Sequence, residues 1–198
     1  DYVLPFPGNR LLVESTRFSP IPLSEDQLDD DLNSCLRRVL ESSDFTVHRR
    51  ESGIIPMGMP ALPQPDHPNW FLAGTRGGAV RPASGFAFAD IQDWARQCAC
   101  NLATEGTPVG HPAAAPVLRW MDDLFLSVLV RDPDRAPDLF MAMARNLEPD
   151  QFVRFMTGCN TTGDLLAVVK SLPKIPFLRE LAAGWLPVKS STTQTLAS

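Results

Sequence analysis

A chain of 198 residues can form one ordinary domain or parts of two, and 44% hydrophobic with 21% charged residues is typical of a globular protein. The net charge of −5 argues against nucleic-acid binding, which needs a basic face. The sequence contains no run of about 18 apolar residues, which a membrane span would need. The first residues lack the charged and apolar regions of a signal peptide.

The chain opens with two strand-like runs, Tyr2 to Phe6 and Arg10 to Arg17, on either side of Pro7-Gly8-Asn9. That triplet is a strong turn signal, so the runs are predicted to form a hairpin. Ser24-Glu25-Asp26-Gln27 matches a capping box and predicts the start of a helix. One face of this helix should be apolar and consist of Leu28, Leu32, Cys35, Leu36, Val39 and Leu40.

The middle of the chain alternates short apolar runs with loops. Phe45 to Arg50 is predicted as a strand, residues 51–68 as a long ordered loop, and Trp70 to Ala73 as a short buried strand. A glycine-rich turn follows, and it leads into an amphipathic helix predicted from Ser84 to about Leu102.

Beyond a Gly/Pro/Ala linker from Thr104 to Pro116, every segment is predicted to be helical, with prolines between the helices. The last helix, Phe177 to Leu186, carries apolar residues on more than one face and has Lys and Arg residues around it. Such a helix belongs either to the core or to a membrane interface, which it would contact through Phe177, Leu178, Leu181 and Trp185. Residues 188–198 are predicted to be a disordered Ser/Thr tail.

The glycine-rich turn is the first candidate site. Gly74, Gly77 and Gly78 precede Pro82 and Gly85, where the new helix is expected to begin. Glycines allow positive φ and a close approach to the backbone, and a helix N-terminus adds the positive end of its dipole. The turn therefore either binds an anion, such as the phosphates of a cofactor, or serves only as packing geometry.

Glu14 is the second candidate, because it lies inside a strand and shares a face with Leu12 and Thr16. A carboxylate held on an apolar sheet would have a raised pKa, which suits a proton donor or acceptor. The alternative is a solvent-facing glutamate on an edge strand.

Other reactive side chains give weaker signals. The four cysteines are predicted to be buried, reduced thiols, and no histidine stands near them at a zinc-binding spacing, so we expect no metal. The sequence contains neither Gly-x-Ser-x-Gly nor a P-loop motif, which argues against a hydrolase or a P-loop enzyme.

Three segments together resemble the C-terminal half of FAD-dependent lycopene cyclases of the bacterial and plant type. They are DYVLPFPGNRLLVEST (residues 1–16), ESGIIPMGMPALP (51–63) and FLAGTRGGAVRPASGFAF (71–88). They correspond, in order, to a strand with an L-x-E-x-T motif, a Glu-x-x-x-Ile-Pro-hydrophobic-Gly loop, and a glycine-rich turn with P-x-x-G-[YF] opening a helix. The resemblance covers roughly residues 1 to 185.

The resemblance implies ring closure without net redox change. A terminal double bond of lycopene is protonated, and the carbocation closes to a cyclohexene ring of the β type and loses a proton. It implies reduced FAD as the cofactor, NAD(P)H as its reductant, and Glu14 as the proton donor or relay. The residues implied to border the flavin are Gly74, Thr75, Gly77, Gly78, Pro82 and Gly85, and those implied to border the substrate are Glu51, Ile55, Pro56 and Gly58.

The resemblance also implies an α+β fold. Residues 1–50 would belong to an antiparallel substrate-binding sheet, 51–104 to a Rossmann-like FAD-binding domain, and 105–187 to a helical region. The Gly-x-Gly-x-x-Gly unit that grips the ADP part of FAD is absent from the sequence, and Gly74-Thr75 stands where many related flavoproteins have Gly-Asp. We therefore expect a C-terminal piece of a longer protein that is inactive by itself.

A bilayer-dissolved substrate implies a cytoplasmic enzyme that associates peripherally with the membrane. Two other functions stay open from the sequence. One is another FAD-dependent flavoprotein that acts on isoprenoids, a reductase or a monooxygenase. The other is an inactive truncated module that binds lipid.

Overall fold

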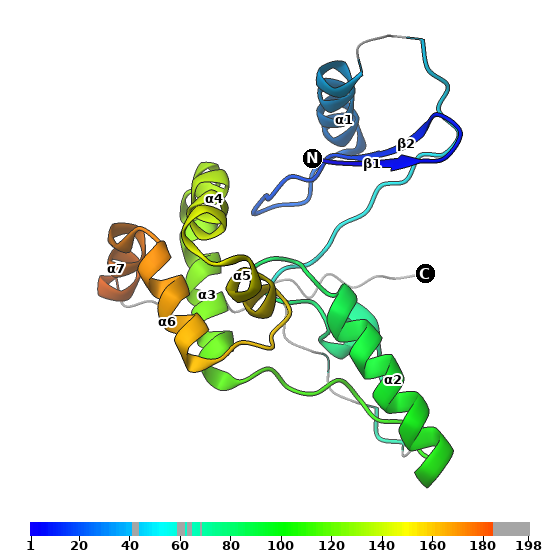
Figure 1. Ribbon diagram of the computed structural model, residues 1–198, viewed down its shortest axis with the longest axis vertical. Coiled ribbons are helices and arrows are strands. Elements are labelled where there is room, and N and C mark those ends of the chain that lie inside the picture. The colour runs from blue at the N-terminus through cyan, green and yellow to red at the C-terminus, as the bar shows by residue number, and fades with distance from the viewer. Residues whose placement is uncertain (41–43, 59–61, 63–64, 68, 184–198) are drawn as a thin grey trace. The chain divides into compact units, whose positions relative to one another are not determined.

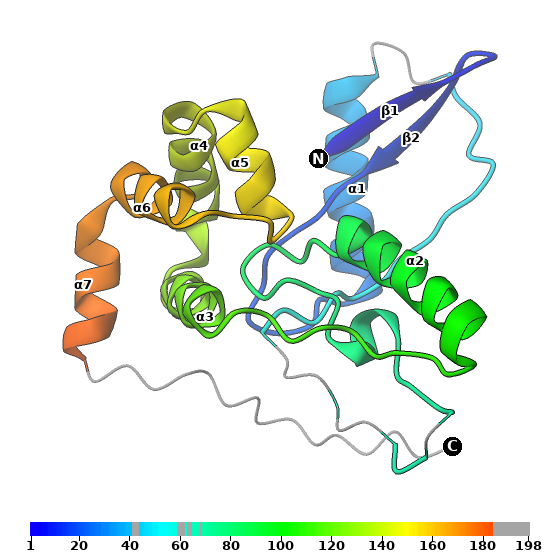
Figure 2. The same ribbon diagram turned by 60° about the horizontal axis from the view of Figure 1, so that its bottom comes forward.

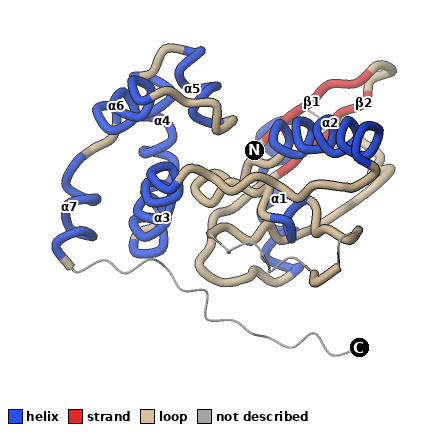
Figure 3. The backbone as a smooth tube through the Cα atoms, turned by 90° about the horizontal axis from the view of Figure 1, so that it is seen from below, coloured by secondary structure: helices blue, strands red, loops and turns tan. Residues whose placement is uncertain are grey.

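The computed structural model describes residues 1–40, 44–58, 62, 65–67 and 69–183. The chain divides into two compact units, Asp1–Ile55 and Pro56–Ser198. Figures 1, 2 and 3 show that helices dominate and that the strands form one hairpin.

The first unit is built on the predicted hairpin. Strand β1 (Tyr2–Phe6) pairs antiparallel with β2 (Arg10–Glu14), with Tyr2 opposite Glu14 and Phe6 opposite Arg10. Gly8 and Asn9 both have positive φ, 77° and 56°, which is the backbone conformation that a tight hairpin turn requires. The second strand ends at Glu14, three residues before its predicted end at Arg17.

Helix α1 (Glu25–Val39) begins at the predicted capping box. The Ser24 hydroxyl accepts from the Gln27 amide at 3.3 Å, and the Gln27 side chain accepts from the Ser24 amide at 3.0 Å. The helix packs against β2 (Figure 2). It buries Cys35 completely, whereas Cys98 is half-buried and Cys100 and Cys159 are exposed, so the prediction of four buried thiols is wrong.

The strand predicted from Phe45 to Arg50 does not form. Phe45 and Val47 are exposed, and a side-chain contact holds the segment instead, since Arg50 pairs with Asp29 of α1 at 2.8 Å. Alternating apolar residues form a strand only where a neighbouring backbone supplies the ladder, and in the described residues β2 pairs only with β1.

The second unit opens with loops. Trp70 to Ala73 is a loop rather than the predicted buried strand, and Trp70 is largely exposed. A 3₁₀ turn, η1 (Gly74–Gly77), follows. Helix α2 (Phe88–Glu105) begins four residues after the predicted start at Ser84, because the Gly85 amide donates to the Arg81 carbonyl at 2.9 Å and closes a tight turn there.

The C-terminal helices are α3 (Pro116–Arg131), α4 (Ala136–Asn146), α5 (Pro149–Met156), α6 (Thr162–Ser171) and α7 (Lys174–Ala182), with a 3₁₀ turn, η2 (Pro133–Arg135), between α3 and α4. They gather in one cluster in all three views, where α3 packs on α7 and α6 packs on both α4 and α5. The core lies among them. Its most buried apolar side chains include Val128, Leu139, Met143 and Val168.

The fold prediction is therefore confirmed in part. A mostly helical chain with one antiparallel hairpin replaces the expected wider sheet, and the described residues contain no strand of a Rossmann-like layer. The domain limits drawn from the sequence stay a prediction, and both Trp185 and the tail 188–198 lie outside the described residues.

Asp164 links two helices and makes stability depend on pH. Its buried carboxylate accepts from Arg154 of α5 at 2.9 and 2.7 Å and from the Thr161 amide at 2.8 Å. The pKa of Asp164 lies well below its usual range, mainly because Arg154 donates hydrogen bonds to the carboxylate. The hydrogen bond from the Thr161 amide is the second cause. The stabilisation is therefore complete near neutral pH and is lost progressively as the pH falls below about 4.

Asp164→Asn should lower the free energy of unfolding at pH 7 and flatten its decline between about pH 5 and pH 2. Urea denaturation followed by circular dichroism at several pH values measures both effects. Asp134→Asn, which removes an exposed carboxylate, serves as the control and should keep the wild-type slope. An unchanged slope in Asp164→Asn would contradict the assignment.

Candidate functional site

The glycine-rich turn uses its glycines for backbone geometry. Gly74, Gly78 and Gly85 have φ of 58°, 90° and 70°, a region that other residues rarely adopt. Gly77 is required for another reason, because a Cβ there would lie 2.5 Å from the Leu72 carbonyl oxygen and 2.8 Å from His111. The turn is thus tightly specified by the protein around it.

His111 anchors the start of the turn from a loop 37 residues later. Its Nε2 accepts from the Gly74 amide at 3.2 Å, and its ring stacks on Trp94 of α2 with 4.6 Å between centroids. Burial lowers the pKa of His111, which favours the neutral imidazole that this hydrogen bond needs. Trp94 is itself held by its Nε1, which donates to the Val109 carbonyl at 2.7 Å.

The amides of the turn are largely engaged within it. Gly77 donates to Ala73, Gly78 to Thr75, and Ala79 to Gly74, at 3.1 to 3.2 Å. The groups that remain accessible to a ligand are the exposed Thr75 and Arg76, together with open space above Gly74, where a Cβ would meet nothing within 4 Å. A ligand would therefore meet side chains and the Gly74 backbone rather than a cradle of free amides.

A buried ion pair joins the segment after the turn to α3. Arg81 Nε and Nη2 donate to Asp122 Oδ2 and Oδ1 at 3.1 and 3.0 Å, and the Ala83 amide also donates to this carboxylate. Arg81 is 5% exposed and Asp122 is 2% exposed. Burial raises the pKa of Asp122, and the hydrogen bond and charge of Arg81 oppose that rise. The guanidinium also stacks over Phe155 of α5, 3.9 Å from its ring centroid.

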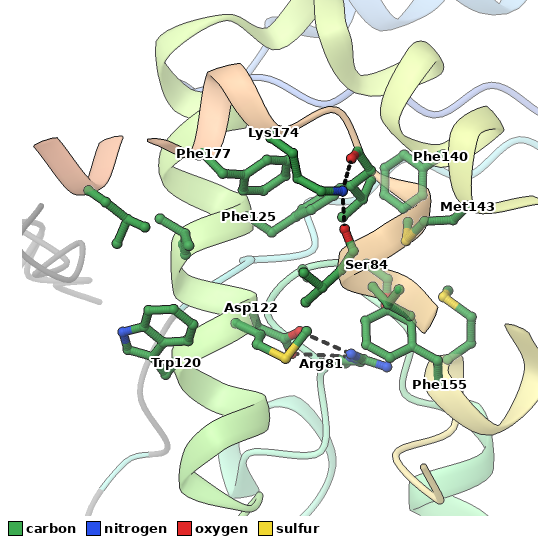
Figure 4. A pocket seen from close by; sticks show the side chains of 18 of the residues that line it. Arg81, Ser84, Trp120, Asp122, Phe125, Phe140, Met143, Phe155, Lys174 and Phe177 are labelled. Carbon is green, nitrogen blue, oxygen red and sulfur yellow. Dashed lines mark hydrogen bonds and ion pairs between the residues drawn. The ribbon is translucent and has the colours of Figure 1, made fainter. Parts of the chain in front are cut away.

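This pair forms part of the wall of an apolar cavity of about 280 Å³ (Figure 4). All five C-terminal helices contribute to the wall, with Phe125 from α3, Phe140 and Met143 from α4, and Phe177 from α7 among its large side chains. Phe125 packs edge-on against Phe140 at 5.4 Å between centroids. The other polar wall residues are Ser84, whose hydroxyl accepts from the Phe86 amide at 3.3 Å, and Lys174, which donates to the last carbonyls of α6. Such a cavity suits a hydrocarbon group.

Glu14 lies in the first unit, at the end of β2. Its side chain is exposed, and its Oε1 accepts from the Thr16 hydroxyl at 2.9 Å. Within that unit it matches the solvent-facing alternative rather than a carboxylate buried on an apolar sheet. Its role as an acid stays a prediction.

The predicted substrate loop spans the boundary between the units. Glu51 and Ile55 are exposed at the end of the first unit, where Glu51 pairs with Arg49. Pro56 and Gly58 begin the second unit and are half-buried. A Cβ on Gly58 would lie 2.7 Å from Leu126 of α3, so this part of the loop rests on the helix that lines the cavity.

Sequence reasoning missed Arg81, Asp122 and His111. A signal for Asp122 exists, because it falls on the buried stripe of α3 between Leu118 and Phe125, at a position where a helix facing the core normally has an apolar residue. Arg81 and His111 lie in loops, where periodicity says nothing about burial.

The comparisons place the chain in a family. A family model described as lycopene cyclase protein matches residues 1–182. This match assigns the chain to a family of enzymes. The protein belongs to the lycopene cyclase family. Comparison with curated proteins and with solved structures gives no match.

The turn fits the expected flavin in part. The open backbone at Gly74 allows the close approach that a ribityl-phosphate chain needs, and Thr75 and Arg76 offer a hydroxyl and a positive charge beside it.

Among the described residues no helix is long and apolar enough to cross a membrane. The same residues contain no group of three His, Cys, Asp or Glu placed to hold a metal.

Removing one partner of the Arg81–Asp122 pair should destabilise the protein strongly, whereas replacing both partners by apolar residues should destabilise it little. Arg81→Met leaves a buried carboxylate unpaired and should lower the free energy of unfolding by about 3–5 kcal/mol. Arg81→Met combined with Asp122→Leu removes both charges and should recover most of that loss. Urea denaturation of both variants measures this difference, and equal destabilisation would show that the loss in Arg81→Met does not come from leaving the Asp122 carboxylate unpaired.

Proposed function

We propose that this chain is part of a flavin-dependent lycopene cyclase, which closes the linear ends of lycopene into β-ionone rings in carotenoid biosynthesis. Family membership supports the cyclase class. The observation that carries the substrate assignment is the apolar cavity of about 280 Å³ among the C-terminal helices. Its volume lies just below the range of about 300–1,000 Å³ for small-molecule sites, so it suits one end of a long hydrocarbon.

The proposed reaction is an acid–base isomerisation. A proton adds to a terminal double bond, the resulting carbocation is attacked by a second double bond of the same molecule, and loss of a proton from the new ring leaves an isomer of equal mass. Glu14 is the proposed acid. It is the carboxylate of the L-x-E-x-T strand, and the Thr16 hydroxyl that donates to it fixes one of its oxygens.

The proposed cofactor is FAD in its reduced form, with NAD(P)H as the reductant. Gly74, Thr75, Gly77, Gly78, Pro82 and Gly85 are the residues that would border it. When bound, a reduced flavin supplies electron density that stabilises a nearby positive charge. The contribution of the protein is positional, since His111 and the Arg81–Asp122 pair fix the two ends of this segment.

We further propose that the protein works in the cytoplasm at a membrane surface, which it contacts through α7. Ile175, Leu178 and Leu181 recur at a spacing of three along α7 and are all exposed, with Lys170 and Arg179 exposed nearby. Apolar side chains flanked by cations suit an anionic bilayer surface. Leu178 and Leu181 also line the cavity, which supports entry of an apolar ligand from this side.

Vesicle flotation tests the membrane contact. Leu178→Glu should weaken binding to vesicles that contain anionic lipid by about tenfold or more, because it replaces apolar burial with a repelled charge. Val153→Glu alters an equally exposed apolar residue on α5 and should bind as the wild type does. Equal loss in both variants would argue against α7 as the contact.

Pigment analysis tests the enzymatic function. The complete reading frame that contains this chain is expressed in a lycopene-accumulating host, and the products are separated and weighed by mass spectrometry. A cyclase returns an isomer of equal mass, a reductase adds hydrogen, a monooxygenase adds oxygen, and a module that only binds lipid leaves lycopene unchanged.

Glu14→Gln in the same reading frame should abolish ring closure, because the amide cannot deliver a proton, while flavin absorbance of the purified protein should persist. Glu105→Gln changes another exposed glutamate, at the end of α2, and should retain wild-type conversion. Normal cyclisation by Glu14→Gln would remove its role as the acid.

A further inference from the structure

The hydrogen bond between His111 and the glycine-rich turn can exist only while the imidazole is neutral. Its Nε2 accepts from the Gly74 amide at 3.2 Å, so Nε2 carries no proton and the ring proton is on Nδ1. Protonation would place an N–H on Nε2, opposite the N–H of Gly74, and two donors cannot share a hydrogen bond. Acid therefore removes this contact.

The Gly74 amide links the turn to a distant segment. The Gly74 carbonyl accepts from the amides of Gly78 and Ala79, so those hydrogen bonds stay local, whereas the Gly74 amide reaches a loop 37 residues later. Gly74 has a φ of 58°, and a Cβ there would meet no atom within 4 Å. The hydrogen bond to His111 is thus a restraint that side-chain packing at Gly74 does not duplicate.

The ring of His111 has a second contact that does not depend on its protonation state. It stacks on Trp94 of α2, with 4.6 Å between the centroids and 25° between the planes. The indole is held in turn by its Nε1, which donates to the Val109 carbonyl at 2.7 Å. A cation over an indole face is also attracted to it, so protonation should leave the ring on α2 while it detaches the turn.

Burial lowers the pKa of His111, so the contact with Gly74 is complete above about pH 6.5 and is lost as the pH falls through this lowered pKa. Residues 106–116 include no other titratable side chain. Those on the elements packed against His111 are Arg76 of η1 and Asp90, Asp93, Arg96, Cys98, Cys100 and Glu105 of α2. Asp93 pairs with Arg96, and Asp90 must be controlled for, because burial raises its pKa toward the same range.

We propose that His111 is a pH-sensitive switch for the glycine-rich turn: the neutral ring holds Gly74 in place, and the protonated ring releases it while staying stacked on Trp94. The proposed function places the flavin against this turn, so acid would weaken flavin binding there, and only this consequence rests on the proposed function. The switch itself is a property of the fold and can be measured without flavin or lycopene.

Proton–nitrogen correlation NMR of the full chain, recorded from about pH 8 to about pH 4.5, tests the switch. The Gly74 amide resonance should shift with the same midpoint as the ring protons of His111. Its protection against solvent exchange should fall about tenfold across that midpoint, the effect of losing one hydrogen bond. The Trp94 indole N–H should stay protected, because its bond to Val109 does not involve His111.

Two substitutions should fix the turn in one state each. His111→Gln places an amide oxygen near the position of Nε2 and does not titrate, so Gly74 should stay protected at every pH. His111→Phe keeps a ring for Trp94 but offers no acceptor, so Gly74 should be unprotected at every pH. His67→Gln is the matched control, because Nδ1 of His67 also accepts a backbone amide, that of Asn69 at 3.2 Å, in another loop. It should keep the wild-type titration of Gly74.

Any of four results would overturn the proposal. They are a Gly74 amide that keeps its shift and protection through the midpoint of His111, a Gly74 titration that persists in His111→Gln and so belongs to Asp90 or another group, loss of that titration in His67→Gln, and loss of Trp94 indole protection together with that of Gly74. Each can occur whether or not the protein cyclises lycopene, so failure here and failure of the proposed function are distinguishable.

Discussion

The buried pair between Arg81 and Asp122 holds the segment before α2 against α3. Charged groups are stable in an apolar interior only when they are paired, so the segment after the glycine-rich turn cannot leave α3 without a large cost in free energy. The same guanidinium stacks on Phe155 and thereby adds α5 to the arrangement. One side chain thus fixes a loop against two helices, and the shape of the cavity follows from where it holds them.

Local signals in the sequence predicted local structure well. The hairpin and the start of α1 were found because Pro7-Gly8-Asn9 and the capping box act within a few residues. The predictions of strands at Phe45 to Arg50 and Trp70 to Ala73 were wrong, because a strand depends on a partner backbone that can be distant in the sequence. Alternation of apolar residues does not reveal whether such a partner exists. The late start of α2 reflects a turn closed at Gly85, which the amphipathic pattern does not register.

The same division applies to the candidate site. Motif order predicted the family to which the chain belongs, whereas the roles of the glycine-rich turn and of Glu14 stay predictions. The cavity could not be predicted, because its wall comes from five helices and a loop, and Arg81 lies 41 residues from its partner. The position of Asp122 on the buried face of α3 indicated an unusual polar site, but the sequence pattern does not identify Arg81 as its partner. His111 gave no clue, because only the folded chain brings it to Gly74.

The placement of polar groups gives the cavity a direction. Arg81 and Asp122 lie together in Figure 4, whereas aromatic and aliphatic side chains make up most of the wall. A molecule whose two ends are alike would enter such a space with equal free energy either way round. One whose ends differ would be sorted by which end lies beside the ion pair. The buried pair thus makes one part of a largely apolar wall different from the rest.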